Sequence, residues 1–149
     1  MNKHGFTLME LLVVIAILGI LSIIAIPNMI GISDDVKKEN MIDDAKKLIS
    51  LAKYQVNIDY SIRKDSSVTK YYYAKDLDID GSIKVDPDGG EYDKEHSFVK
   101  YIKSNGTVSY CVYLKGSVRR IGTGNAYDSE ECISENNLYS KKNVVNVNN

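Results

Sequence analysis

The sequence predicts an α+β fold in which one long N-terminal helix, embedded in a membrane over its first half, packs on a small antiparallel β-sheet. Three observations support this prediction. The first is an apolar stretch over residues 11–26 that only Gly19 and Ser22 interrupt. The second is a series of apolar residues at helical spacing further along the chain. The third is the Asn105-Gly106 pair, which lies between two segments typical of β-strands.

Composition and motifs limit the classes of function open to the chain. Its 149 residues allow one domain of ordinary size, and the net charge of −1 gives no basic excess typical of a nucleic-acid binder. The sequence contains no phosphate-binding Walker loop and no Gly-rich dinucleotide loop. His96 has no cysteine or second histidine near it that could complete a metal or nucleophile site. We therefore expect a protein that is not an enzyme and needs no cofactor.

The apolar stretch has the length of a membrane-spanning helix. At about 1.5 Å per residue, residues 6–26 are long enough to cross a hydrocarbon layer roughly 30 Å thick. A cleaved secretory signal is disfavoured, because the apolar run is longer than usual and ends in a poor cleavage site before Pro27. A plain membrane anchor leaves Glu10 unexplained, because a carboxylate in lipid is costly and usually has a partner.

After Pro27 the apolar residues follow a helical period, with charged residues on the other faces. Spacings of three and four residues place one apolar face on a helix that we expect to end near Tyr60 and to pack against a core. This face comprises Met41, Ile42, Ala45, Leu48, Ile49, Ala52 and Val56. Gly19 and Pro27 are weak points of the long helix, because glycine adds backbone freedom and proline clashes with the preceding turn.

The clearest element of the second half of the chain is a hairpin. Asn105-Gly106 is a preferred pair for a two-residue type I′ turn, and it joins expected strands over residues 97–104 and 107–115. Such a turn fixes the register. The expected pairs include Val99 with Val112 and Tyr101 with Tyr110.

Two further segments can extend the sheet. Residues 118–121 can add a strand after the hairpin. Near the C-terminus, residues 144–145 either form a last edge strand or belong to a disordered tail.

The two cysteines, Cys111 and Cys132, allow two interpretations. They are either unrelated buried thiols or a disulfide pair. The pair is favoured if the apolar segment places the rest of the chain outside a membrane, where disulfides persist.

A short acidic segment resembles the first half of a calcium-binding loop, with Asp76, Asp78 and Asp80 at alternate positions. The twelfth position of such a loop requires a bidentate glutamate, but here it is Pro87. An exposed acidic turn is therefore the favoured interpretation, and calcium binding by these three aspartates is the alternative.

The first 30 residues resemble the N-terminus of type IV prepilins and pseudopilins. The resemblance combines a short basic head, Gly5 before the hydrophobic Phe6, Glu10 four residues later and a long apolar run. In that family a prepilin peptidase cuts after the glycine and methylates the new N-terminal amine. The resemblance implies a cut between Gly5 and Phe6, methylation of Phe6, and pairing of Glu10 with the Phe6 amine of another copy during assembly. Met9 is a slight departure, since Val or Ile is commoner there.

The resemblance also implies an organisation of the chain. It comprises a leader over residues 1–5, a membrane and fibre-core helix half over 6–27, an amphipathic helix half over 28–60 and a sheet-containing head over 61–149. In this pilin-like plan a disulfide, here Cys111 with Cys132, bounds a C-terminal loop. The segment between Gly19 and Pro27 is expected to lose helical order in an assembled fibre.

The function that the resemblance implies is that of a structural subunit of a type IV pilus, used in adhesion or motility. The subunit would wait in the bacterial inner membrane and then join an extracellular pilus. Its partners would be other pilin subunits, prepilin peptidase, the pilus assembly machinery and membrane lipid, with no specific nucleic acid. One alternative is a pseudopilin of a type II secretion or DNA-uptake system. A second alternative is a membrane-anchored binding domain that never polymerises.

Overall fold

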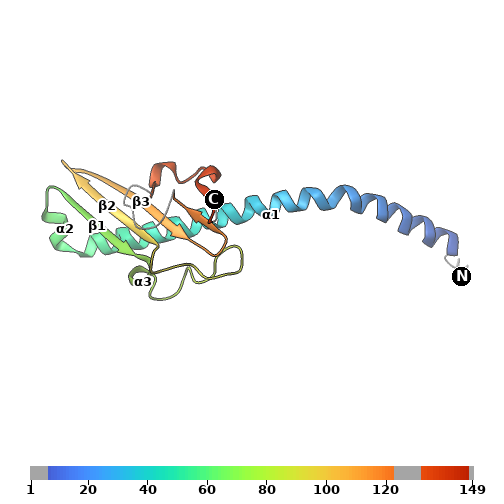
Figure 1. Ribbon diagram of the computed structural model, residues 1–149, viewed down its shortest axis with the longest axis horizontal. Helices are drawn as coiled ribbons and strands as arrows, with labels where there is room; N and C mark the ends of the chain where they lie inside the picture. The colour runs from blue at the N-terminus through green and yellow to red at the C-terminus, as the bar shows by residue number, and fades with distance from the viewer. Residues whose placement is uncertain (1–6, 123–131, 148–149) are drawn as a thin grey trace, which may run out of the picture. The chain divides into compact units, whose positions relative to one another are not determined.

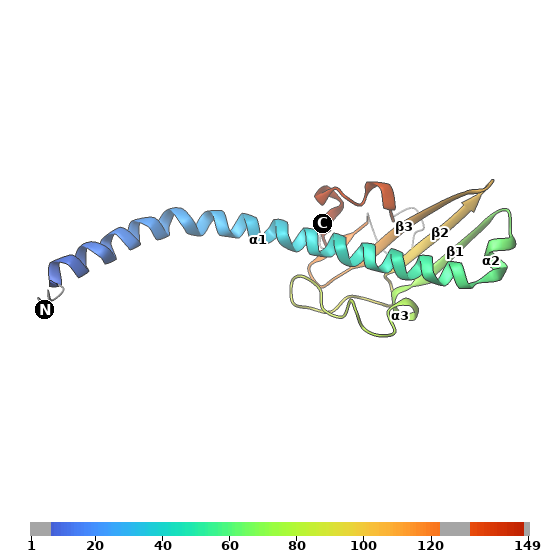
Figure 2. The ribbon, with the colours of Figure 1, turned by 180° about the vertical axis from the view of Figure 1, so that it is seen from behind.

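A computed structural model describes residues 7–122 and 132–147 (Figures 1 and 2). For residues 23–31 and residue 63 it describes the backbone only. The chain divides into two compact units, Met1–Val36 and Lys37–Asn149. We call them unit 1 and unit 2.

The longest element is helix α1, Leu8–Ile58, which contributes residues to both units. Its backbone is helical through both Gly19 and Pro27. The helix ends two residues before the expected Tyr60, because Asp59 adopts an extended conformation and its carboxylate accepts a hydrogen bond from the Ser61 N–H at 3.0 Å. Asp59 is therefore the N-cap of the next helix, α2 (Tyr60–Lys64).

Within the described residues, unit 2 contains an antiparallel sheet with strand order β1-β2-β3-β4-β6, and β5 pairs with β3. The strands are β1 (Val68–Tyr73), β2 (Phe98–Ser104), β3 (Thr107–Lys115), β4 (Arg119–Ile121), β5 (Ile133–Ser134) and β6 (Val144–Asn146). The short helices are α3 (Ala74–Leu77) and the 3-10 helices η1 (Glu135–Asn137) and η2 (Lys141–Asn143). Figures 1 and 2 show β1, β2 and β3 beside the C-terminal half of α1.

The apolar face of α1 forms the core of unit 2 with the inner face of the sheet. All seven residues predicted for this face are buried. Six of them pack in one cluster with sheet residues such as Val99, Val112 and Leu114, and Val56 packs in a second cluster with Ile62 and Tyr101. The predicted α+β fold, a long helix packed on an antiparallel sheet, is therefore confirmed.

The predicted hairpin is also confirmed. Asn105 and Gly106 both have positive φ, 49° and 81°, as a type I′ turn requires. The predicted register holds from one end of the ladder to the other, and it includes Val99 with Val112 and Tyr101 with Tyr110. Strand β2 begins one residue later than expected.

Both segments that were expected to extend the sheet form strands on its β4 side. Residues 119–121 form β4, which pairs with β3. Residues 144–146 form β6, which pairs with β4, so the edge strand is confirmed and not the disordered tail.

The buried Asp86 and the half-buried Asp88 connect loops that lie far apart in the sequence. Asp86 accepts hydrogen bonds from the N–H groups of Asp88 and Gly90, both at 2.9 Å, and from that of Ser117. Asp88 accepts from Arg119 Nε at 2.8 Å. Burial disfavours the ionised form of Asp86, but these hydrogen bonds outweigh it and lower the pKa of its carboxyl below the ordinary value.

Candidate functional site

The start of α1 contains a reciprocal set of hydrogen bonds between Thr7 and Glu10. The Thr7 N–H donates to Glu10 Oε2 at 2.7 Å, and the Thr7 hydroxyl donates to the same oxygen at 2.9 Å. In return, the Glu10 N–H donates to Thr7 Oγ1 at 3.2 Å. This is a capping box, in which two side chains satisfy backbone donors that the helix leaves unpaired.

The capping box gives Glu10 a role within its own chain that the sequence interpretation missed. The signal was present, because Thr-x-x-Glu before an apolar run is the usual pattern of such a box. Among the described residues, Glu10 Oε1 accepts no hydrogen bond, whereas Oε2 accepts from Thr7. One oxygen of the carboxylate is therefore engaged by its own helix, and the other can accept from another molecule.

The large apolar residues on both sides of Glu10, over residues 8–21, are exposed on all sides of the helix. Their exposed fractions range from 43% at Val14 to 82% at Leu8. The set comprises Leu8, Met9, Leu11, Leu12, Val13, Val14, Ile15, Ile17, Leu18, Ile20 and Leu21. A helix that is apolar on every face requires a cover of lipid or of other protein chains. Among the described residues, no helix combines the length and apolarity needed to cross a membrane.

The remaining residues of the predicted N-terminal site are only partly described. Gly5 and Phe6 lie outside the described residues. Gly19 lies within α1, and a Cβ atom built on it meets nothing within 4 Å. Pro27 lies within the bounds of α1. Loss of helical order between Gly19 and Pro27 in a fibre stays a prediction.

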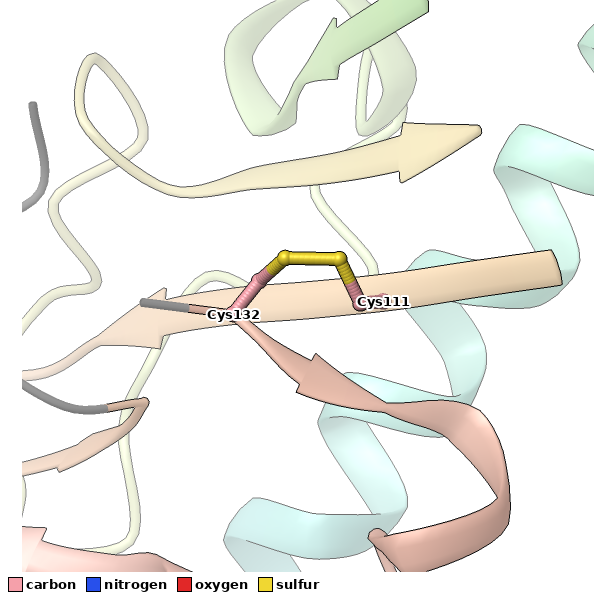
Figure 3. The surroundings of a disulfide bond; sticks show 2 residues. All are labelled: Cys111 and Cys132. Atoms are coloured by element: carbon pink, nitrogen blue, oxygen red, sulfur yellow. A yellow bond between two sulfur atoms is a disulfide. The ribbon is translucent and has the colours of Figure 1, made fainter. Parts of the chain in front are cut away.

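A disulfide joins Cys111 on β3 to Cys132, which directly precedes β5 (Figure 3). The two Cα atoms are 5.4 Å apart, and the cysteines are separated by 21 positions in the sequence. The bond fastens the segment leading into β5 to the middle of the sheet, where Cys111 also pairs with Ser134. By the chain-entropy argument, closing a loop of this size stabilises the fold by about 3 kcal/mol.

The three aspartates of the acidic segment have different surroundings. Asp76 in α3 and Asp80 in the following turn are exposed. Asp78 is buried, and it pairs with Lys94 and accepts a hydrogen bond from Ser82 Oγ at 2.8 Å.

Protein donors thus already occupy the carboxylate of Asp78. Burial opposes its ionisation, but the hydrogen bonds from Lys94 and Ser82 outweigh this effect and lower its pKa below the ordinary value. In the part of the chain that the structure describes, no group of three or more His, Cys, Asp or Glu residues could hold a metal ion. Calcium binding at Asp76, Asp78 and Asp80 stays a prediction.

Comparison with known proteins gives matches at the N-terminus and beyond it. The model of the family described as the prokaryotic N-terminal methylation motif matches residues 1–26. A type II secretion system core protein G from Klebsiella michiganensis is 33% identical over 103 residues, which cover 61% of this chain and 72% of that protein. A protein of the same name from Dickeya chrysanthemi is 40% identical over 49 residues, which cover 33% of this chain and 32% of that protein. No solved structure gives a significant match.

Proposed function

Because this chain belongs to the type IV pilin and pseudopilin family, we propose that it is a pseudopilin, a structural subunit of a secretion-system fibre. The observation that supports this choice is the extent of the similarity. The N-terminal motif covers residues 1–26, but the match to a core protein G extends over 103 residues and therefore reaches well beyond the shared motif. The similarity thus points to a secretion pseudopilin rather than to pilins in general.

This proposal replaces the surface pilus as the first interpretation of the sequence. Both similar proteins take their names from a type II secretion system. Adhesion and motility rested on the general resemblance to type IV pilins, which the N-terminal motif alone provides. We retain the membrane as the place where the subunit waits, and prepilin peptidase and like subunits as its partners.

The proposed processing places a new amine beside the capping box. A cut between Gly5 and Phe6 makes Phe6 the first residue, directly before Thr7. The box holds the carboxylate of Glu10 at the same end of the helix through Oε2. In the proposed fibre, Oε1 of Glu10 accepts from the methylated amine of a neighbouring subunit.

The pairing of the Glu10 carboxylate with the amine of a neighbouring subunit sets the axial register between their helices, because apolar packing alone cannot set it. Lipid tails are as apolar as leucine side chains, so the exposed residues over 8–21 gain little hydrophobic energy when they leave lipid for a fibre core. A charged amine and a carboxylate in the same apolar surroundings are costly when apart and favourable when paired. The pair therefore favours one axial offset between neighbouring helices.

The experiment that tests the proposal is co-expression with a prepilin peptidase, followed by intact-mass measurement and isolation of fibres. We expect loss of residues 1–5 and addition of one methyl group. An unprocessed chain that keeps Met1 and forms no fibre would instead support the membrane-anchored binding domain.

Two variants separate the capping role of Glu10 from its pairing role. Glu10→Gln keeps an oxygen that can accept from Thr7, since glutamine also completes a capping box, but it removes the charge. Glu10→Ala removes both. We expect normal cleavage of both variants and a fibre yield that falls in both. Normal fibre yield from Glu10→Gln would show that the charge has no role in assembly.

The system that the fibre serves requires a second measurement. Deletion of the chain in its own bacterium should abolish secretion of exported proteins while sheared surface filaments persist. Loss of surface filaments with intact secretion would return the type IV pilus to first place.

A further inference from the structure

We propose that unit 2 has a subunit contact of its own, in which an acidic apolar groove of one copy binds a basic segment of a second copy. This inference rests on the proposed polymerisation. The α3 groove is lined by Leu51, Tyr54, Gln55, Leu77, Ile79 and Asp80. The Tyr139 patch comprises Tyr139, Lys141 and Lys142, at the second 3-10 helix.

The α3 groove exposes large apolar side chains that unit 2 leaves uncovered. Ile79 is 84% exposed and Tyr54 is 64% exposed. Single exposed apolar residues are common on protein surfaces, but these two line the same groove together with Leu51 and Leu77. The groove therefore has the apolar floor of an interaction site.

The edge of the α3 groove is acidic. Asp80 lines it, and Asp76 lies one residue before Leu77 in α3. Both aspartates are exposed. Within residues 7–122 and 132–147, neither forms a salt bridge, in contrast to the buried Asp78. An occupant of this groove should therefore present an apolar or aromatic group beside positive charge.

The Tyr139 patch presents such a combination. Tyr139 is 73% exposed, and the ammonium of Lys46 lies 5.1 Å from the centroid of its ring. The Nζ atom of Lys141 lies 3.7 Å from Oε2 of Glu39. Lys142 is exposed and forms no salt bridge in the described part of the chain. Tyrosine is enriched among the residues that contribute most to binding at interfaces, and here two lysines follow it closely in the sequence.

The two surfaces cannot meet within one copy. Figures 1 and 2 both show α3 and the C-terminal segment of η1 and η2 on opposite sides of α1. Two copies of the groove would bring like charges together, and so would two copies of the patch. The favourable pairing is groove to patch, which is a heterologous contact that repeats from copy to copy and builds an open chain.

The positions of the two surfaces along α1 also predict an offset. The α3 groove lies against α1 residues 51–55, and the Tyr139 patch lies against residues 39–46. Their centres differ by about ten residues, or about 15 Å at the rise of an α-helix. Copies that pack with parallel α1 helices through this contact are therefore displaced by about 15 Å along the helix direction.

Cross-linking in assembled fibres of the full chain tests the contact directly. Ile79→Cys and Tyr139→Cys are introduced together and treated with a short bismaleimide, while the native cysteines remain joined in their disulfide. We expect a ladder of dimers, trimers and larger products. The matched control replaces Ile79→Cys by Val108→Cys, at an exposed position on β3, and should give monomer.

Different outcomes would show that the groove-to-patch contact is wrong and that the proposed function is wrong. If wild-type fibres form but the Ile79 and Tyr139 cysteines give no more product than the control, the contact is wrong and the proposed function stands. If the wild-type chain is neither processed nor polymerised, the proposed function fails and the contact fails with it.

A charge exchange provides an independent readout. Lys142→Asp should lower the cross-linked fraction by up to about fivefold, as expected for one exposed ion pair. Asp80→Lys, at the aspartate that lines the α3 groove, should do the same, and combining the two substitutions should restore the wild-type fraction. Lys64→Asp, at an exposed lysine of α2, should leave it unchanged. Equal effects of Lys142→Asp and Lys64→Asp, or no recovery in the double variant, would overturn the contact.

Discussion

Two regions of helix α1 differ in the exposure of their apolar side chains. Over residues 41–56 of α1, the seven residues of the predicted apolar face are at most 5% exposed, because they pack in the core of unit 2. Over residues 8–21 the large apolar residues occupy every face and are at least 43% exposed. The folding of unit 2 buries the apolar face of the first region. The apolar side chains of the second region require a cover of lipid or of other protein chains.

The largest expected effect distinguishes the two regions. Leu48→Ala should lower the free energy of unfolding of unit 2 by about 2–5 kcal/mol, because it opens a cavity in a fully packed core. Leu12→Ala makes the same chemical change at a position that is 52% exposed, and it should leave that free energy unchanged. Denaturant unfolding followed by circular dichroism measures both. Equal losses of stability in the two variants would contradict the comparison.

The disulfide should have the next largest effect, again confined to unit 2. Replacing both cysteines by serine should lower the free energy of unfolding by about 3 kcal/mol, since the unfolded chain regains the freedom of the closed loop. Chemical denaturation of the two forms gives the difference. The variant should still be cleaved by prepilin peptidase, and a failure of cleavage would show that the two regions depend on each other.

Acid should weaken unit 2 through its buried aspartates. Hydrogen bonds lower the pKa of Asp78 and Asp86 below the ordinary 3.8, so each stabilises the fold above that value. This stability is lost as the pH falls through the lowered values, because the folded state must then take up protons that the unfolded state binds more readily. Melting temperatures should fall below about pH 4. Asp86→Asn should flatten this dependence, and an unchanged slope would exclude Asp86 as its source.

The smallest expected effect concerns Gly19. A Cβ atom at this position meets nothing within 4 Å, so Gly19→Ala causes no clash. It should stabilise the helical form of α1 by up to about 1 kcal/mol, because alanine has a higher helix propensity than glycine. Unit 2 should melt at an unchanged temperature. If assembly requires the helix to lose order between Gly19 and Pro27, fibre yield should fall. An unbroken helix over these residues in the assembled fibre, seen by electron microscopy, would contradict that requirement.

The features that could be predicted from the sequence depend on residues that lie close together along the chain. The apolar face of α1 repeats every three to four residues, and the type I′ turn at Asn105-Gly106 determines its own register. Both predictions needed only local spacing. The end of α1 was placed slightly late, because the cap at Asp59 competes with helix continuation after Ile58.

The features that the sequence did not predict depend on contacts between distant residues. Asp86 accepts a hydrogen bond from the N–H of Ser117, 31 positions away, and no local spacing indicates this contact. Asp78 pairs with Lys94, 16 positions away, and no spacing within the acidic segment shows this cation. The capping box of Thr7 and Glu10 is the exception, since its spacing is local and visible.

The capping box also bears on how long a subunit can be stored before it is used. A bare carboxylate in lipid would attract water or take up a proton, and either change would disturb the bilayer or the charge that assembly needs. The two hydrogen bonds that Thr7 donates to Glu10 Oε2 replace part of that lost hydration from within the chain itself. We expect Thr7→Ala to shorten the lifetime of the unassembled pool in the membrane, which a pulse-chase measurement would record before any fibre is formed.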